Sequence, residues 1–150
     1  MVFKAPENIA IRNRVMRSVF LAGSIEMGVA ELWQDKVSED LKGMYHIFNP
    51  RRDSWDSSWE QSIENSKFSQ QVNWELDSLD KADYIIFYFD PKTKSPITLM
   101  ELGLHANSRN ILVCCPEGYW RKGNVDVVCN KYNIPMFETL NDIIRNLKIK

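Results

Sequence analysis

The chain of 150 residues, with a mass of 17.6 kDa, is 44% hydrophobic and 26% charged. This length and apolar content fit one domain with a real core, residues 1–150, and exclude a wholly disordered protein. Its 19 basic and 20 acidic residues leave a net charge of −1, which gives no overall positive field for a nucleic acid polymer or an anionic membrane.

The first part of the chain predicts two strands, a helix and a long loop. The apolar run of residues 19–22 predicts a buried parallel strand that ends at a turn of small residues. Apolar residues at helical spacing predict a helix over residues 29–41, and residues 45–48 predict a second strand. Residues 51–64 are rich in Ser, Asp and Trp and predict a long surface loop, a kind of segment that is often functional.

The middle of the chain contains its strongest strand. Residues 68–79 return to a period near 3.6 and predict a second helix. The continuous apolar and aromatic run of residues 84–89 predicts the central strand of a parallel sheet. A loop with two prolines, residues 90–96, leads to a third helix over residues 97–106.

The last part of the chain continues the alternation of strands and helices. Residues 111–115 predict a strand, and residues 116–123 predict a loop. Residues 125–129 predict a short helix or an irregular turn, residues 136–137 a fifth short strand, and residues 140–147 a closing amphipathic helix. This alternation predicts a doubly wound α/β sheet with right-handed crossovers.

Ligands in such folds bind beside the carboxyl ends of the strands. The first loop there, residues 23–28, matches neither the dinucleotide pattern GxGxxG nor the nucleoside triphosphate pattern GxxxxGK[ST]. Its backbone N–H groups and the Ser24 hydroxyl are still suited to approach a ligand. The alternative is an ordinary tight turn between a strand and a helix.

The segment after the central strand contains the most specific candidate. Glu101 lies in the opening turns of a helix among apolar neighbours, and Gly103 lets a backbone or a ligand come close. A carboxylate in such a place is a candidate nucleophile, and Glu75 on the preceding helix, beside Trp74, is a candidate partner. Enzymes that cleave glycosidic bonds usually have two carboxylates near one cleft, one as nucleophile and one as proton donor or acceptor. The alternative is a pair of solvated surface acids.

The long loop contains a basic and aromatic group. Arg51 and Arg52, with Trp55 and Trp59, are suited to hold a phosphate and to stack a base. The alternative is a loop that its tryptophans anchor on the core.

Several classes of site are not indicated. Glu101 and His105, four residues apart on a helix, lack a third ligand, so we expect neither a metal nor a cofactor. Three cysteines without CxxC spacing predict neither a disulfide framework nor a zinc site. The apolar runs are too short to span a bilayer, and residues 1–17 lack the apolar segment of a secretory signal, so we expect a cytoplasmic protein.

Several short segments, taken in order, resemble one known family. They are Leu21-Ala22-Gly23-Ser24-Ile25, Asn49-Pro50-Arg51-Arg52, Gln71-Val72-Asn73-Trp74-Glu75, Ala82-Asp83, Ser95-Pro96-Ile97, Met100-Glu101-Leu102-Gly103 and Arg121-Lys122-Gly123-Asn124-Val125. With this order and spacing, residues 19–128 resemble the nucleoside 2-deoxyribosyltransferase superfamily. They are most similar to its nucleoside 2-deoxyribosyltransferase-like branch.

The resemblance implies a flavodoxin-like (Rossmann-like) doubly wound parallel sheet of about five strands with flanking helices. It also implies that Glu101 attacks the anomeric carbon of a 2-deoxyribosyl group and displaces the base. The covalent deoxyribosyl-enzyme then passes the sugar to another base or to water. Glu75 stands where the family usually has Asp, so the implied role of Glu75 is to protonate or orient the base.

A small-molecule nucleoside or nucleotide substrate follows from the same resemblance. Transferases of the family usually have an Asp six residues before the nucleophile, whereas the related deoxynucleoside 5′-monophosphate N-glycosidases have a Ser that meets the phosphate. This chain has Ser95 there, which favours a nucleotide, with further contacts from Ser24 and one of the two arginines, Arg51 or Arg52. The other implied substrate-binding residues are Gly23, Ile25, Trp74, Gly103 and Asn124.

Members of this family typically pair their subunits. The loop of residues 123–126 then reaches a neighbour's site through Asn124, so we expect a homodimer or a higher homo-oligomer. The alternative to an enzyme is a nucleotide-binding or sensing module that keeps the fold without turnover; Glu101, Glu75 and Gly103 together favour catalysis. A third possibility is a flavodoxin-like domain with an unrelated ligand, which the fold alone does not exclude.

Overall fold

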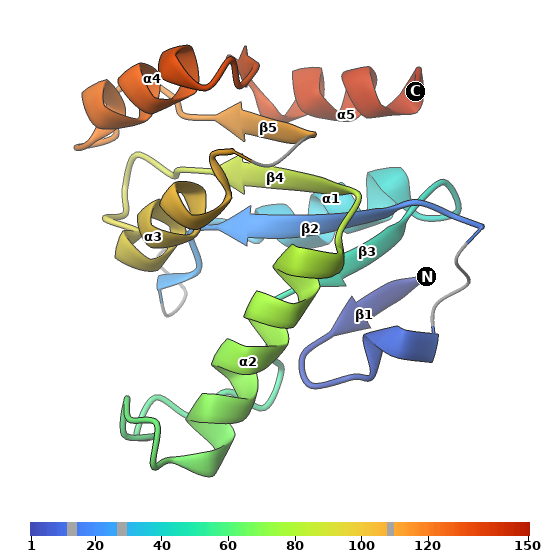
Figure 1. Ribbon diagram of the computed structural model, residues 1–150, viewed down its shortest axis with the longest axis vertical. Helices are drawn as coiled ribbons and strands as arrows, with labels where there is room; N and C mark the ends of the chain where they lie inside the picture. The colour runs from blue at the N-terminus through green and yellow to red at the C-terminus, as the bar shows by residue number, and fades with distance from the viewer. Residues whose placement is uncertain (12–14, 27–29, 108–109) are drawn as a thin grey trace.

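The computed structural model describes residues 1–11, 15–26, 30–107 and 110–150. Within these ranges the chain forms a sheet of six parallel strands in the order β1-β3-β2-β4-β5-β6 (Figure 1). The strands are β1 (Val2–Lys4), β2 (Ser18–Gly23), β3 (His46–Asn49), β4 (Tyr84–Tyr88), β5 (Ile111–Cys114) and β6 (Met136–Phe137). The helices are α1 (Trp33–Leu41), α2 (Ser66–Lys81), α3 (Pro96–His105), α4 (Lys122–Lys131), α5 (Leu140–Lys148) and a 3₁₀ helix, η1 (Ile9–Ile11).

Helices cover both faces of the sheet. α1 and α5 pack on one face, and α2, α3 and α4 pack on the other (Figure 1). Successive side chains of a strand point to opposite faces, so β4 supplies both layers: Ile86 lies in the core under α1 and α5, and Phe87 lies in the core under α2, α3 and α4. Burial on both faces explains why β4 is a continuous apolar run in the sequence.

This architecture confirms the flavodoxin-like fold class. If β1 is set aside, the remaining strands follow the flavodoxin order, in which the first strand lies between the second and the third. β1 is an edge strand beyond the roughly five strands that the sequence predicts. It has three residues, of which Phe3 alone is buried, and such a short run shows no period.

Two helices differ from their predicted bounds. α4 is a ten-residue helix, although the sequence predicts a loop up to residue 123 and then a short helix or turn. Its buried residues are Val125 and Cys129, so its apolar stripe is too narrow to predict the whole helix. α1 begins at Trp33, and Val29, where the sequence predicts its start, lies outside the described residues.

The order of the strands fixes where a ligand site is expected. The chain leaves β2 in one direction through α1 to β3, and it then returns past β2 through α2 to β4. The carboxyl ends of β2 and β4 therefore form the topological switch point of the sheet. Gly23 pairs with Tyr88 in the register of these strands, so the loops that follow them start side by side.

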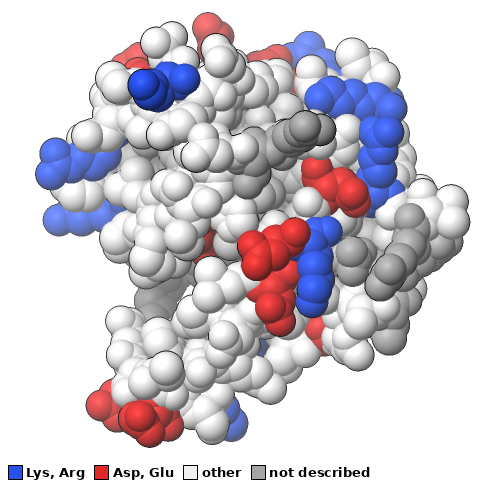
Figure 2. Space-filling model, viewed as in Figure 1, with Lys and Arg blue, Asp and Glu red and all other residues white. Residues whose placement is uncertain are grey.

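The surface has no single dominant charge on the face that Figure 2 shows. Lys and Arg lie in small groups among small groups of Asp and Glu, and much of this face is uncharged. The same view shows a hollow between α3 and the lower half of α2, with acidic atoms set back from the surface. In the described parts of the chain, no helix is both long and apolar enough to cross a membrane.

Candidate active site

Two carboxyl groups from neighbouring helices form the centre of the site. Glu101 lies on the second turn of α3 and is 7% exposed, and Glu75 lies on α2 and is partly buried. Burial, and after it the negative charge of Glu75, together raise the pKa of Glu101 to about 8. Burial also raises the pKa of Glu75 to about 7. Two such carboxyls close together do not both ionise readily, so the pair retains a proton near neutral pH.

Gln71 holds Glu75 in place from one helical turn away. Its side-chain Nε2 donates to Oε1 of Glu75 (2.7 Å) and to the backbone carbonyl of Pro50 (2.9 Å). The bond to Glu75 lowers the pKa of that carboxyl and so opposes the effect of burial. Gln71 is buried, and its Oε1 has no hydrogen-bond partner among the described residues. The sequence analysis did not single out Gln71, although its spacing of four residues from Glu75 was the available signal.

Three hydroxyl groups form a buried cluster at the switch point. The Oγ of Ser24 and the Oγ of Ser95 lie 2.5 Å apart, and Oγ1 of Thr93 lies 2.7 Å from the first and 2.8 Å from the second. The backbone N–H of Asp90 also donates to Ser24 Oγ (3.0 Å). The structure thus brings together the predicted residues Ser24 and Ser95, and it adds Thr93, which sequence reasoning missed.

Glu26 binds the loop that opens α3. Its Oε1 accepts the backbone N–H groups of Lys94 (2.8 Å) and Ser95 (2.5 Å). Ser95 is the N-cap of α3 with φ of 47°, and Glu26 has φ of 33°. The sequence analysis treated the first loop as a ligand loop without a role for Glu26, and Gly28 of that loop lies outside the described residues.

The two arginines after β3 have different surroundings. Arg51 donates from Nε to Oε1 of Gln34 (2.8 Å) and from Nη2 to the carbonyl of Glu31 (2.9 Å), so it ties the loop to the start of α1. Burial lowers its pKa. The guanidinium of Arg52 lies 5.0 Å from the centre of the Trp59 ring, and its buried Nη1 has no hydrogen-bond partner among the described residues. Arg52 therefore keeps a donor for a ligand, whereas Arg51 is engaged in the fold.

A comparison with known protein families gives the family of the chain. The model of the family described as nucleoside 2-deoxyribosyltransferase like matches residues 16–119. The chain belongs to the nucleoside 2-deoxyribosyltransferase-like family. The match includes the carboxyl pair, the hydroxyl cluster and both arginines, and it ends before Asn124. A comparison with curated proteins gave no match.

In this family member, two predicted substrate-binding residues serve packing. Trp74 is 8% exposed, its indole N–H donates to the carbonyl of Glu7 (2.8 Å), and its ring lies 6.4 Å from that of Phe20. A Cβ on Gly23 would lie 2.5 Å from the Trp33 ring and 2.5 Å from the Tyr88 carbonyl. The missing side chain of Gly23 thus makes room for the protein itself. Ile25, also predicted, follows this turn and is partly exposed.

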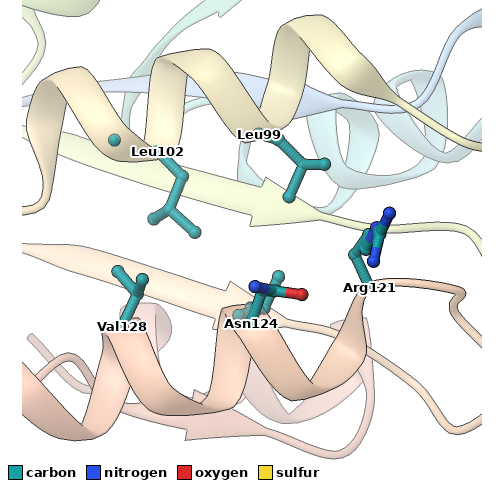
Figure 3. A pocket seen from close by; sticks show the side chains of 7 residues that line it. Leu99, Leu102, Arg121, Asn124 and Val128 are labelled. Carbon is teal, nitrogen blue, oxygen red and sulfur yellow. The ribbon is translucent and has the colours of Figure 1, made fainter.

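Two other predicted residues, Gly103 on α3 and Asn124 on α4, lie together between these two helices. They line a hollow of about 330 Å³ in which side chains of the two helices face each other (Figure 3). The lining does not include Glu101 or Glu75. A Cβ on Gly103 would meet nothing within 4 Å, so packing in one chain does not require a glycine there. The other lining residues are Leu99, Leu102, Arg121, Val125 and Val128.

The described residues of this family member contain no group of three or more His, Cys, Asp or Glu side chains arranged for a metal ion. His105, four residues after Glu101, lies with Nε2 3.9 Å from Oδ1 of Asp80.

Proposed function

We propose that the chain cleaves or exchanges the N-glycosidic bond of a 2′-deoxynucleoside or its 5′-monophosphate. The observation that supports this most is the carboxyl pair: Glu101 is buried beside Glu75, and the pKa of each is raised toward or above neutrality. Double displacement at a sugar carbon needs one ionised and one protonated carboxyl. Since Glu101 has the higher pKa, the pair's proton rests on Glu101 near neutral pH and must pass to Glu75 before Glu101 attacks. Membership of the family agrees with this chemistry.

The proposed reaction has two displacements. In the first, the carboxylate of Glu101 attacks C1′ of the sugar, the C1′–N bond breaks, and the base leaves with the bonding electron pair. Glu75 gives its proton to the departing base, which balances the charge that develops there. In the second, water or another base attacks C1′, the ester bond to Glu101 breaks, and Glu75 takes back a proton from the attacking group.

The hydrogen bond from Gln71 fits this division of roles. It orients the carboxyl of Glu75, while burial keeps the pKa of that group near 7 and so suits it to give and take a proton at neutral pH. Ionisation is less favourable for Glu101 than for Glu75, because the charge of Glu75 adds to the effect of burial at Glu101, whereas the hydrogen bond from Gln71 lowers the pKa of Glu75. A carboxylate without a hydration shell is a more reactive nucleophile, which is the use that we propose for this burial.

We also propose that two or more copies of the chain associate through the outer face of α3. Ile97, Met100 and Leu104 on this face are each more than half exposed. Apolar side chains repeated at helical spacing on the surface are typical of a helix that a partner covers. The adjoining hollow contains Asn124, the residue that the family resemblance places at a subunit boundary. A second copy of the chain is therefore the occupant that we propose for this face.

The test is to incubate the protein with the four common 2′-deoxynucleosides and their 5′-monophosphates and to measure free base. We expect release from at least one of them, and mass spectrometry should detect one deoxyribosyl group on the protein. Glu101→Gln keeps the shape but removes the attacking oxygen anion, so release should fall by about three orders of magnitude or more and the adduct should be lost. Binding without any base release would instead support a sensing module.

A further inference from the structure

The start of α3 is where a phosphate group would be expected to bind. Helix N-termini present free backbone N–H groups and a positive dipole end, and in open α/β sheets they do so at the carboxyl ends of the strands. α3 begins at the switch point, directly after the loop that follows β4, and it also contains Glu101. A nucleotide whose sugar reaches Glu101 would therefore find this helix start as the nearest set of such donors.

The backbone N–H groups directly before this helix start already hold an anion that belongs to the protein. Oε1 of Glu26 accepts the N–H of Lys94 at 2.8 Å and the N–H of Ser95 at 2.5 Å. Charge-assisted hydrogen bonds of this length are among the stronger ones in proteins. A phosphate at the same place would have to displace the carboxylate or lie against it, and two anions in a partly desolvated site repel each other.

The neighbouring polar groups are also engaged. The hydroxyls of Ser24, Thr93 and Ser95 lie within 2.5–2.8 Å of one another, so their hydrogen-bonding capacity is largely used inside the cluster. The carboxylate of Asp90 accepts the N–H of Lys92 (2.9 Å) and the more distant N–H of Glu31 (3.4 Å), which places a second negative group beside the loop.

Two basic side chains, Arg51 and Lys94, have other partners. The guanidinium of Arg51 donates to Gln34 and to the carbonyl of Glu31. The ammonium of Lys94 lies 5.5 Å from the centre of the Trp120 ring. The side-chain contacts described above at the start of α3 therefore come from acidic or neutral groups, while Arg52 after β3 is a cation that keeps a donor for a ligand.

We propose that Glu26 is a specificity-determining residue that takes the place of a substrate phosphate and directs the enzyme to 2′-deoxynucleosides rather than to their 5′-monophosphates. This inference rests on the proposed glycosidic function and names its substrate class. Ser95 in the sequence favours a nucleotide substrate. In the structure, however, the hydroxyl of Ser95 is bonded within the cluster and its N–H is held by a carboxylate. A neutral 5′-hydroxyl has no charge to be repelled by Glu26 and can bind beside it.

The test compares a 2′-deoxynucleoside with its 5′-monophosphate in the wild type and in Glu26→Gln. The Gln side chain keeps an oxygen that accepts the same two N–H groups, but it removes the charge. We expect the wild type to have the higher kcat/KM for the nucleoside, and the ratio of monophosphate to nucleoside kcat/KM to rise about tenfold or more in Glu26→Gln. Glu31→Gln is the matched control, since it removes an exposed acid of the same segment without touching the start of α3, and it should leave the ratio unchanged.

A binding measurement separates this inference from the proposed reaction. Calorimetry with inorganic phosphate and with the 5′-monophosphate should show tighter binding to Glu26→Gln than to the wild type, whether or not either protein releases base. If no base is released but this difference in binding is found, the reaction is wrong and the role of Glu26 stands. A wild type that prefers the 5′-monophosphate overturns the role of Glu26, and so does an unchanged ratio in a folded Glu26→Gln protein.

Discussion

Replacement of the proposed nucleophile should change how the stability of the protein depends on pH. Burial, with the charge of Glu75, raises the pKa of Glu101 to about 8 from a usual value of 4.5. The native protein therefore holds this proton more tightly than the unfolded chain does, and the free energy of unfolding falls as the pH rises from about 4.5 to about 8. Each full pH unit in this window costs about 1.4 kcal/mol, and because the titration is incomplete near both pKa values, the loss from pH 5 to pH 8 is about 3.5 kcal/mol.

The Glu101→Gln variant has no carboxyl proton to release at this position, so its free energy of unfolding should not fall in this pH window. We expect the stability of the variant relative to the wild type to rise by about 3.5 kcal/mol between pH 5 and pH 8. Urea unfolding followed by tryptophan fluorescence at several pH values measures this difference, with the slope m as a check that the same surface is exposed. Glu64→Gln, which changes an exposed acid, is the control. Parallel pH curves for Glu101→Gln and the wild type would refute the buried-carboxyl reasoning.

Two further predictions concern the neighbours of the pair and the outer face of α3. Gln71→Leu removes the donor that lowers the pKa of Glu75, so the alkaline limb of the kcat/KM profile should move upward by about one pH unit; the adjacent exposed Gln70→Leu should leave it in place. Met100→Asp with Leu104→Asp puts two charges on the apolar face and should give a smaller species in sedimentation than the wild type. An unchanged sedimentation coefficient would place the association elsewhere or show that none occurs.

The parts of the site on regular elements were predictable from the sequence. Glu75 lies on the helix before β4, and Glu101 lies on the helix after it, so right-handed crossovers put both helices on neighbouring positions of one face. Their closeness then follows from topology alone. The direction of each side chain is harder to predict, because successive residues of a helix are rotated by about 100° around its axis. Met100 directly precedes Glu101 in the sequence, yet it is exposed while Glu101 is buried.

The parts on loops were not predictable. Glu26 and Ser95 have positive φ angles of 33° and 47°, a region that residues other than glycine rarely enter. No periodicity or motif in the sequence predicts a positive φ angle for a glutamate or a serine. Their mutual hydrogen bond, and the meeting of Ser24 with Thr93, therefore depend on the tertiary structure around the switch point.

Gly23 shows how a structural residue affects this chemistry at a distance. The sequence predicts that its small size lets a ligand approach, but the close neighbours are the carbonyl of Tyr88 and the ring of Trp33. This tight join of β2 to β4 lets the N–H of Ser24 donate to that carbonyl at 3.2 Å. The Ser24 hydroxyl then accepts the N–H of Asp90 and meets Ser95, the first residue of the turn that leads to Glu101. A larger residue at position 23 would separate the strand ends and so move the hydroxyl cluster relative to the nucleophile.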